Sequence, residues 1–431
     1  MIGPLIEEAG RRAHAADVAV KTDETVTLTF EAGRLRSTSY AEERGTNLRV
    51  ISNGRLGVAG VTGEDTGGLI DRALASARVG DPLELLLPEA APLPRVTTHY
   101  PRAAAAQIEE LVQLGRLLID RLSRNGCQVN VVVERTLGSV QLSNTQGLEA
   151  GYDVSGIGLS AEVIRVQGDQ AVVVGDYLAG ADLPGLPAIE AMVDGMLRRI
   201  EWAERIVPAP SGRMPVCFTG GSTAALLLPL QLAFLGKSVL QGASPLAEKA
   251  GEQAFAAGFT LSDEPLLDAR PGSRPMDDEG VPSARLALVE AGVVRHFIYD
   301  LETAARARVR STGHGRRSTF AKPQAAYSNL VVAPGDRSLA ELIAPVEDGL
   351  LVDGLLGVGQ GNVIGGAFSH PVALGYRIRQ GEISGRVTRA AVAANAYDLL
   401  NRMVGLGREL QWIGSSAAPA MLVDGVSVVG E

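Results

Sequence analysis

The sequence contains few of the residues that bind transition metals or cross-link chains, with two cysteines and five histidines among 431 residues. Cys127 and Cys217 each stand at the start of an apolar stretch, and neither belongs to a CxxC or Cys-His pair. This spacing excludes a zinc knuckle and predicts buried, reduced thiols. No two histidines lie within five positions of each other, so the sequence offers no local pair of metal ligands. The histidines are His14, His99, His296, His314 and His370.

Long hydrophobic runs and long basic runs are both absent. The longest apolar run, Leu226–Leu235, is interrupted by Pro229 and Gln231 and is shorter than the roughly 20 residues that cross a bilayer. The N-terminus has early acidic residues and no apolar secretory core, so we expect a soluble cytoplasmic protein with no membrane partner. The net charge is −9, which disfavours nucleic acid as a partner and with it a direct role in DNA topology.

Aromatic residues make up only 4% of a chain that is 46% hydrophobic, so the core must be aliphatic. The 51 glycines and 22 prolines are spread along the chain and predict many tight turns. We expect an α+β fold of antiparallel sheets with peripheral helices. Its expected parts are an N-terminal α+β domain at 1–80, a Pro-rich linker at 81–101, a central α+β region at 102–207 and a glycine-rich, β-rich C-terminal domain at 213–431.

Alternating stretches in the first half of the chain predict short strands. Arg34–Tyr40 and Thr46–Ser52 are expected as separate strands, as are Gln128–Glu134 and Ser139–Asn144. Asn53-Gly54 is typical of a type I′ hairpin and predicts that the strand after it pairs back on the strand before it.

The most apolar stretch runs from Val216 to Gly236. We expect a strand at Met214–Thr219, followed by a helix whose N-cap is Ser222 or Thr223. This helix contains no His, Asp, Glu or Cys, so it supplies no metal ligand or acid-base group.

The second half of the chain has a distinctive order of motifs. Asp263-Glu264-Pro265 is followed by RPMDDEGVPSARLALVEAGVVRHFIYDLETA, then STGHGRR, PQAAYSNLVVAPGDRSLAELI and GGAFSHPVALGYRIRQGEISGRVTRAAVAAN. This order resembles the TldD/PmbA family (peptidase U62 type, also named modulators of DNA gyrase), and within it the PmbA (TldE) branch. The resemblance implies two kinds of subunit, a zinc peptidase with a His-Glu-x-x-x-His helix and a partner that lacks the motif. It also implies unfolded peptides as substrates.

The motif positions in this chain are occupied by hydrocarbon side chains. By rough alignment, Leu228 and Ala233 stand where the family's zinc histidines would be, and Pro229 where its glutamate would be. A further cysteine ligand would fall near Ser415, in Gly414-Ser415-Ser416-Ala417. Because zinc needs nitrogen, sulfur or oxygen donors, we expect no metal, no cofactor and no catalytic residue of its own.

Other polar clusters have simpler interpretations. Asp277-Asp278-Glu279 predicts a solvated turn at the start of a hairpin rather than a cation site. His314, between two glycines and beside arginines, predicts a surface loop. Ser222 and Ser369 are conceivable nucleophiles, but Gly220-Gly221-Ser222 is not a G-x-S-x-G elbow and helix capping explains Ser222. Ser222 and His370 are the candidate peptide-groove residues.

Two functional hypotheses follow. In the first, the chain is a non-catalytic PmbA/TldE-like subunit that shapes the peptide groove of a dimer, with a TldD-like protease or a second copy of itself as partner. In the alternative, it is an active metallopeptidase or other hydrolase with a relocated site. The candidates for that site are His370, His314 and the acidic residues 277–279.

Overall fold

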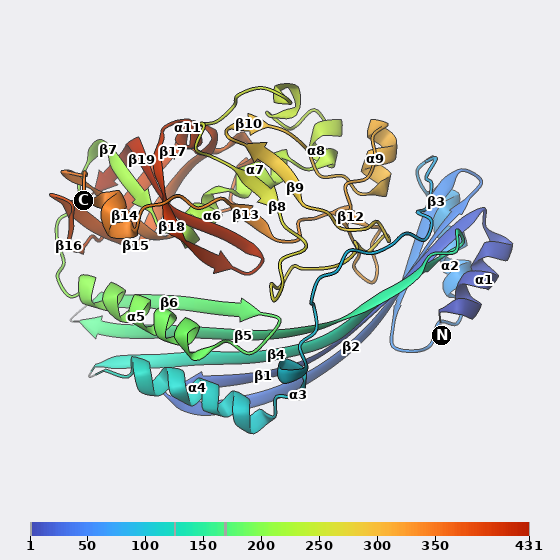
Figure 1. Ribbon diagram of the computed structural model, residues 1–431, viewed down its shortest axis with the longest axis horizontal. Helices are drawn as coiled ribbons and strands as arrows, with labels where there is room; N and C mark the ends of the chain where they lie inside the picture. The colour runs from blue at the N-terminus through green and yellow to red at the C-terminus, as the bar shows by residue number, and fades with distance from the viewer. Residues whose placement is uncertain (1, 125, 168–169, 431) are drawn as a thin grey trace.

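The computed structural model describes residues 2–124, 126–167 and 170–430, and its strands form two large sheets (Figure 1). The first sheet has six strands in the order β3-β2-β1-β4-β5-β6, and all neighbours are antiparallel. Segments before and after the Pro-rich stretch at 81–101 therefore contribute to the same sheet. Its strands are β1 (Ala15–Glu31), β2 (Arg34–Ser52), β3 (Arg55–Thr62), β4 (Cys127–Asn144), β5 (Glu149–Gln167) and β6 (Gln170–Gly180).

The strands of this sheet are longer than the sequence predicted. Residues 34–52 form one strand, as do residues 127–144, so the expected breaks at 41–45 and 135–138 were wrong. Residues 34–43 are exposed and residues 135–138 are half-buried, so neither stretch shows the alternating burial by which a strand is usually identified. The backbone pairs with β1 through these stretches regardless of the side chains. The Asn53-Gly54 hairpin is confirmed, with φ of 52° and 67°.

Helices cover parts of the first sheet. α1 (Gly3–Arg12) and α2 (Leu69–Val79) pack near one end, and α4 (Ile108–Leu122) and α5 (Leu186–Trp202) lie against the other end (Figure 1). The short helix α3 (Pro101–Ala105) precedes α4. The stretch at 81–100 has no helix and only one isolated bridge. Its side chains Leu83, Leu85 and Leu87 are buried.

The second sheet has eleven strands and is built from the C-terminal half of the chain. Its main order is β10-β9-β8-β13-β19-β17-β15-β14-β7, with β16 paired to β15 and β18 paired to β19. The pairs β13–β19 and β14–β7 are parallel and the others are antiparallel. The strands are β7 (Gly212–Phe218), β8 (Leu261–Asp263), β9 (Leu286–Glu290), β10 (Val293–Val294), β13 (Leu330–Val332), β14 (Asp348–Leu355), β15 (Ala367–Arg379), β16 (Glu382–Arg386), β17 (Ala390–Asn395), β18 (Met403–Ile413) and β19 (Ser416–Gly430).

Short helices and one small hairpin complete the C-terminal half. The helices are α6 (Gly220–Leu226), α7 (Leu228–Ala233), α8 (Gly236–Leu240), α9 (Leu301–Ala307), α10 (Leu339–Ile343), α11 (Ala396–Asn401) and the 3₁₀ turns η1 (Ala247–Lys249) and η2 (Val363–Gly365). The hairpin pairs β11 (Gly315–Arg316) with β12 (Gln324–Ala325). The α+β class with mostly antiparallel sheets and helices beside them is confirmed. Among the described residues, no helix is long and apolar enough to span a bilayer.

The expected single helix after β7 is three helices. Pro229 stands in the first turn of α7, where the missing N–H costs no hydrogen bond, whereas inside a longer helix the proline ring would clash. The predicted N-cap at Ser222 or Thr223 was also wrong, because the cap position is Thr219 and no side chain caps the helix. Cys217, on β7, is buried and free as expected, whereas Cys127 is free but only half-buried.

A buried ion cluster joins the first sheet to loops of the C-terminal half at 277–279 and 314–317, and this contact is called the junction. The Arg49 guanidinium (β2) donates to Asp17 (β1) and, across the junction, to Glu279. Arg317 also donates to Asp17. The prediction that residues 277–279 form a solvated turn was therefore wrong, since all three side chains are 0–1% exposed. The hairpin interpretation missed partners that lie more than 200 residues away in the sequence.

Candidate functional site

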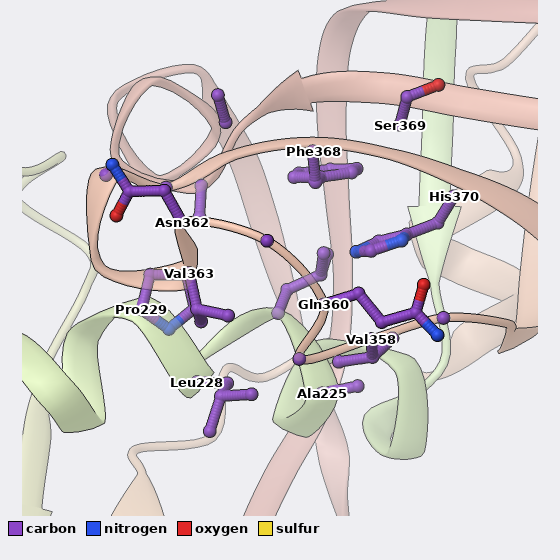
Figure 2. Close-up of a pocket in the computed structure, with 18 of the residues that line it drawn as sticks. Ala225, Leu228, Pro229, Val358, Gln360, Asn362, Val363, Phe368, Ser369 and His370 are labelled. Atoms are coloured by element: carbon purple, nitrogen blue, oxygen red, sulfur yellow. The ribbon is translucent and has the colours of Figure 1, made fainter.

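A cavity of about 480 Å³ lies between helices α6 and α7 and the glycine-rich loop at 356–366 (Figure 2). The loop leads into β15, whose first residues form a further wall. Gly357, Gly359 and Gly361 have φ of 72°, 92° and 79°, a region that side chains disfavour. These glycines let the loop curl over the helices and leave its main chain open to a ligand.

Of the three helix positions that the resemblance assigns to the zinc motif, two line this cavity and one does not. Leu228 and Pro229 line it, whereas Ala233 is fully buried in the core behind it. None of the three side chains has a donor atom. Within the described ranges, no three His, Cys, Asp or Glu side chains gather in a way that could hold a metal ion. The residues at this site therefore do not fit a zinc ion.

His370 lies at this cavity and is its single ionisable lining residue. Its ring stacks on Phe368, with 5.1 Å between ring centroids and 13° between the planes (Figure 2). The two residues are neighbours on one face of β15 because side chains alternate along a strand. Burial lowers the pKa of His370 below its ordinary value. Ser369 projects from the other face of the strand, away from His370 (Figure 2).

Tyr397 fixes the cavity wall and was not identified from the sequence. Its hydroxyl lies 2.8 Å from the Ile364 carbonyl oxygen and 3.3 Å from the Pro229 carbonyl oxygen, so it ties the loop to α7. Phe368 was also missed, although its spacing of two from His370 in a strand is a signal that could have found it. No local pattern around Tyr397 indicates its two contacts.

Among the described residues, the lining contains no Asp, Glu, Lys or Arg. Its polar groups are the amides of Gln360 and Asn362, the His370 ring and the loop backbone. Such a surface can hydrogen-bond a neutral main chain and contact apolar side chains, but it offers no fixed charge for an ionic ligand.

The other sequence candidates do not meet at this cavity. Ser222 is buried and is not among the residues that line the cavity, and its hydroxyl has no hydrogen-bond partner within the part of the chain that the structure describes. His314 is also buried, which contradicts the predicted surface loop. Its Nε2 lies 3.1 Å from Asp263 Oδ2 and its Nδ1 lies 2.8 Å from the Thr312 carbonyl oxygen. Both ring nitrogens of His314 therefore have partners inside the protein, one of them on β8.

Asp263 also accepts hydrogen bonds from the main-chain N–H and the hydroxyl of Ser328. That hydroxyl is bonded to the carboxylate and not to His314, so no nucleophile-base pair is formed. Asp277 and Asp278 are likewise used internally, the former accepting from the Gly315 N–H at 2.8 Å and the latter from the Arg317 N–H at 2.8 Å. These groups support the backbone of the junction.

Glu279 should make the stability of the protein depend on pH. Burial raises its pKa to about 7, although Arg49 acts in the opposite direction. The ordinary value is 4.5, so between about pH 5 and 7 the folded chain holds a proton that the unfolded chain has released. The free energy of unfolding should then fall as pH rises, by up to about 1.4 kcal/mol per pH unit. In urea titrations from pH 5 to 7.5, Glu279→Gln should flatten this slope; an unchanged slope would contradict the assignment.

Comparison with family models gives two matches. The model for the PmbA/TldA metallopeptidase C-terminal domain matches residues 211–430, and the model for PmbA/TldA metallopeptidase domain 1 matches residues 16–77. Among individual proteins, a metalloprotease of Methanothermobacter thermautotrophicus is 25% identical over 95% of this chain and 91% of its own length. Metalloprotease PmbA of Escherichia coli O157:H7 is 22% identical and covers 100% of this chain and 95% of its own length.

Solved structures with the same fold cover nearly the whole chain. TldE from Thermococcus kodakarensis superposes with a TM-score of 0.92 at 25% identity, over 99% of both chains. A structure described as a putative modulator of a DNA gyrase from Thermotoga maritima superposes with a TM-score of 0.90 at 22% identity, also over 99% of both chains.

Proposed function

Because this chain belongs to the PmbA/TldD metallopeptidase family, we propose that it is a TldE-like, non-catalytic subunit that holds unfolded peptide while a partner cleaves it. The observation that carries the proposal is the composition of the 480 Å³ cavity. Leu228 and Pro229 occupy its helical wall, where the family's zinc-binding branch would place a histidine and the glutamate.

The cavity also supports the proposed ligand. It combines a long, side-chain-poor loop with an uncharged lining, so recognition would depend on the peptide main chain more than on its side chains. His370 and Phe368 form a flat stacked surface for one apolar or aromatic residue of the peptide. Such a site suits chains that are extended and differ in sequence. Ser222, being enclosed, has no part in it.

The partner that we propose is a TldD-like protease subunit, with a second copy of this chain as the other possibility to be tested. Proteins named TldD homologue and TldE stand among its relatives, which fits a division into two kinds of subunit. We propose the cytoplasm as the site of this assembly. Size-exclusion chromatography with light scattering, alone and mixed with a TldD-like chain from the same host, distinguishes the two assemblies.

We expect the purified chain alone to carry far less than one zinc per molecule and to cleave no unfolded peptide, because Leu228, Pro229 and Ala233 offer no donor atoms. Metal analysis by mass spectrometry and a quenched-fluorescence peptide assay measure both quantities. The same chain should still bind unfolded peptide.

The control is His370→Ala, which removes the ionisable side chain of the cavity. Stoichiometric zinc, lost on chelation together with peptidase activity of the lone chain, would reject the proposal. Activity that survives chelation in the wild type and disappears in His370→Ala would favour a hydrolase with a relocated site. If the chain is folded but binds no peptide, the proposal that this cavity is a peptide groove is rejected.

A further inference from the structure

A second cavity, of about 630 Å³, lies at the N-terminal end of α6, whereas the first lies at its C-terminal end; the second is lined by α5, β6 and β18. Both tryptophans of the chain, Trp202 and Trp412, line it, although they are 210 positions apart. No sequence motif pointed to this place. In Figure 1, β18 lies above β6, with the turns of α5 beside them.

One long wall of this groove is a face of α5. It presents Ala188, Ala191 and Gly195, followed by Trp202 about two turns later. A Cβ added at Gly195 would meet no atom within 4 Å, so the space above the helix is open. From Ala188 to Trp202 the helix runs about 21 Å. An extended chain of that length has about six residues.

The other walls are two strand edges. β6 is the last strand of the first sheet, and β18 pairs with β19 alone among the described strands. Main-chain groups at or next to both edges already bond other segments of the chain. Just after the end of β6, the Ala181 N–H donates to the Ala269 carbonyl at 3.0 Å, and on β18 the Arg408 N–H donates to the Arg337 carbonyl at 2.7 Å. Edge strands of this kind can hydrogen-bond an added strand.

The outward-facing main-chain groups of β6 can be identified. The Gly175 carbonyl accepts from Arg199, and the Tyr177 N–H donates to the Asp176 carboxylate, so both groups point away from β5. Because direction alternates along a strand, Ala179 faces the same way. Tyr177 and Ala179 both line the groove.

The groove is lined by three arginines and three acidic residues, and the arginines differ in whether they have a carboxylate partner. Arg199 is occupied by Asp176 and Asp353. Arg270 instead lies over the indole of Trp412, with 4.2 Å from its guanidinium carbon to the ring centroid, and in the described part of the chain it has no carboxylate partner. Its guanidinium is held over the ring, and within the described residues its N–H groups have no hydrogen-bond acceptor. Such an arrangement selects a carboxylate.

We propose that this groove binds an extended peptide segment of about six residues, with apolar side chains at its centre and a carboxylate that meets Arg270. The peptide lies along α5 and adds to the edges of β6 and β18. This site is separate from the cavity at Leu228 and His370, and the inference does not rest on the function proposed for that cavity.

Intrinsic fluorescence tests the proposal directly, because both tryptophans belong to the groove. The probe is a six-residue peptide of alternating threonine and valine with a free C-terminal carboxylate. We expect a saturable change in emission. The same peptide with a C-terminal amide should bind about tenfold more weakly, because it loses the charged partner of Arg270. A version with N-methylated main chain should not bind.

Matched variants locate the site. Arg270→Gln should weaken the free-carboxylate probe about tenfold and leave the amide probe unchanged. Gly195→Leu, which fills the open space above α5, should abolish binding of both, whereas Asp194→Leu on the exposed side of the same helix and His370→Ala in the other cavity should leave it intact. Circular dichroism and thermal midpoints establish that each variant is folded.

Three results would overturn the proposal. One is the absence of any emission change with the carboxylate probe on folded protein, and another is equal binding by Gly195→Leu. The third is a monomer-dimer equilibrium that Gly195→Leu shifts to monomer, because the groove would then be an interface between copies of this chain.

Discussion

Replacing Arg49 by alanine is expected to lower the free energy of unfolding by about 3–5 kcal/mol, the range typical for removing one partner of a buried ion pair. The Arg49 side chain is 1% exposed and donates to Asp17 on the neighbouring strand and to Glu279 across the junction. Its removal leaves two carboxylates in a place from which water is excluded.

The rest of the cluster offsets only part of this loss. Burial tends to raise the pKa of Asp17, but Arg317 and Arg49 outweigh it, so the pKa lies below its ordinary value. Without Arg49, Asp17 keeps one cation, and the pKa of Glu279 rises further above its ordinary value, because Arg49 is the strongest influence that lowers it. The stability of the variant should therefore continue to fall as pH rises above 7, where the fall levels off in the wild type.

Urea denaturation followed by circular dichroism measures the change. Arg36→Ala is the matched control, because Arg36 also pairs with an acidic residue, Glu31, but its side chain is 75% exposed. That variant should cost less than about 1 kcal/mol. Equal costs for the two variants would mean that the cluster at the junction contributes nothing beyond a surface ion pair.

Local sequence patterns correctly predicted those elements that depend on neighbouring residues alone. Asn53-Gly54 specified its hairpin because both residues tolerate positive φ, and the apolar stretch after Arg213 specified a buried strand followed by helix. The extent of the strands was not predictable in the same way. Residues 34–43 are exposed, and their backbone pairing with β1 keeps them in a strand.

The burial of polar residues was the main feature that could not be predicted from the sequence. Asp277-Asp278-Glu279 has the composition of a solvated turn, and its buried state depends on cations that approach from β1 and β2. His314 is similar, because its partner Asp263 is 51 positions away. In both cases the residues that decide the environment come from other parts of the fold.

The candidate cavity was predictable only in part. The motif resemblance singled out Leu228 and Pro229, and His370 was singled out by its position in a glycine-rich stretch; the fold brings these residues to one cavity. Ala233 and Ser222 were singled out by the same reasoning and are buried away from it. For Ala233, the start of a new helix at Leu228-Pro229 changes which residues face the cavity, whereas Ser222 lies on the preceding helix α6.

Gly60→Val is expected to cost about 3 kcal/mol or more, through a close contact that only glycine permits. Gly60 lies in β3 opposite Asn47 of β2. The loop at 318–321 crosses these strands, and a Cβ at Gly60 would lie 1.8 Å from the Thr319 carbonyl oxygen. The obstructing atoms belong to the backbone and cannot rotate away, so the loop must lift.

Lifting the loop breaks a specific set of hydrogen bonds. The Asn47 side-chain amide donates to the carbonyl oxygens of Ser318, Thr319 and Ala321 at 3.2, 3.0 and 3.1 Å. Amide hydrogen exchange at 317–321 should accelerate in Gly60→Val. Gly156→Val is the control, because this strand glycine has no atom closer than 3.8 Å to an added Cβ, and it should be close to neutral.

The two large predictions act on one junction, so they should not add. Arg317 directly precedes the lifted loop and holds Asp17, which is also a partner of Arg49. Once Gly60→Val has displaced the loop, part of the cluster is already broken. Removing Arg49 then lowers the free energy of unfolding by less than it does in the wild type. The double variant should therefore cost less than the sum of the single variants, with a coupling of about 1 kcal/mol or more. Strict additivity would mean that the loop and the ion cluster hold the two sheets together independently.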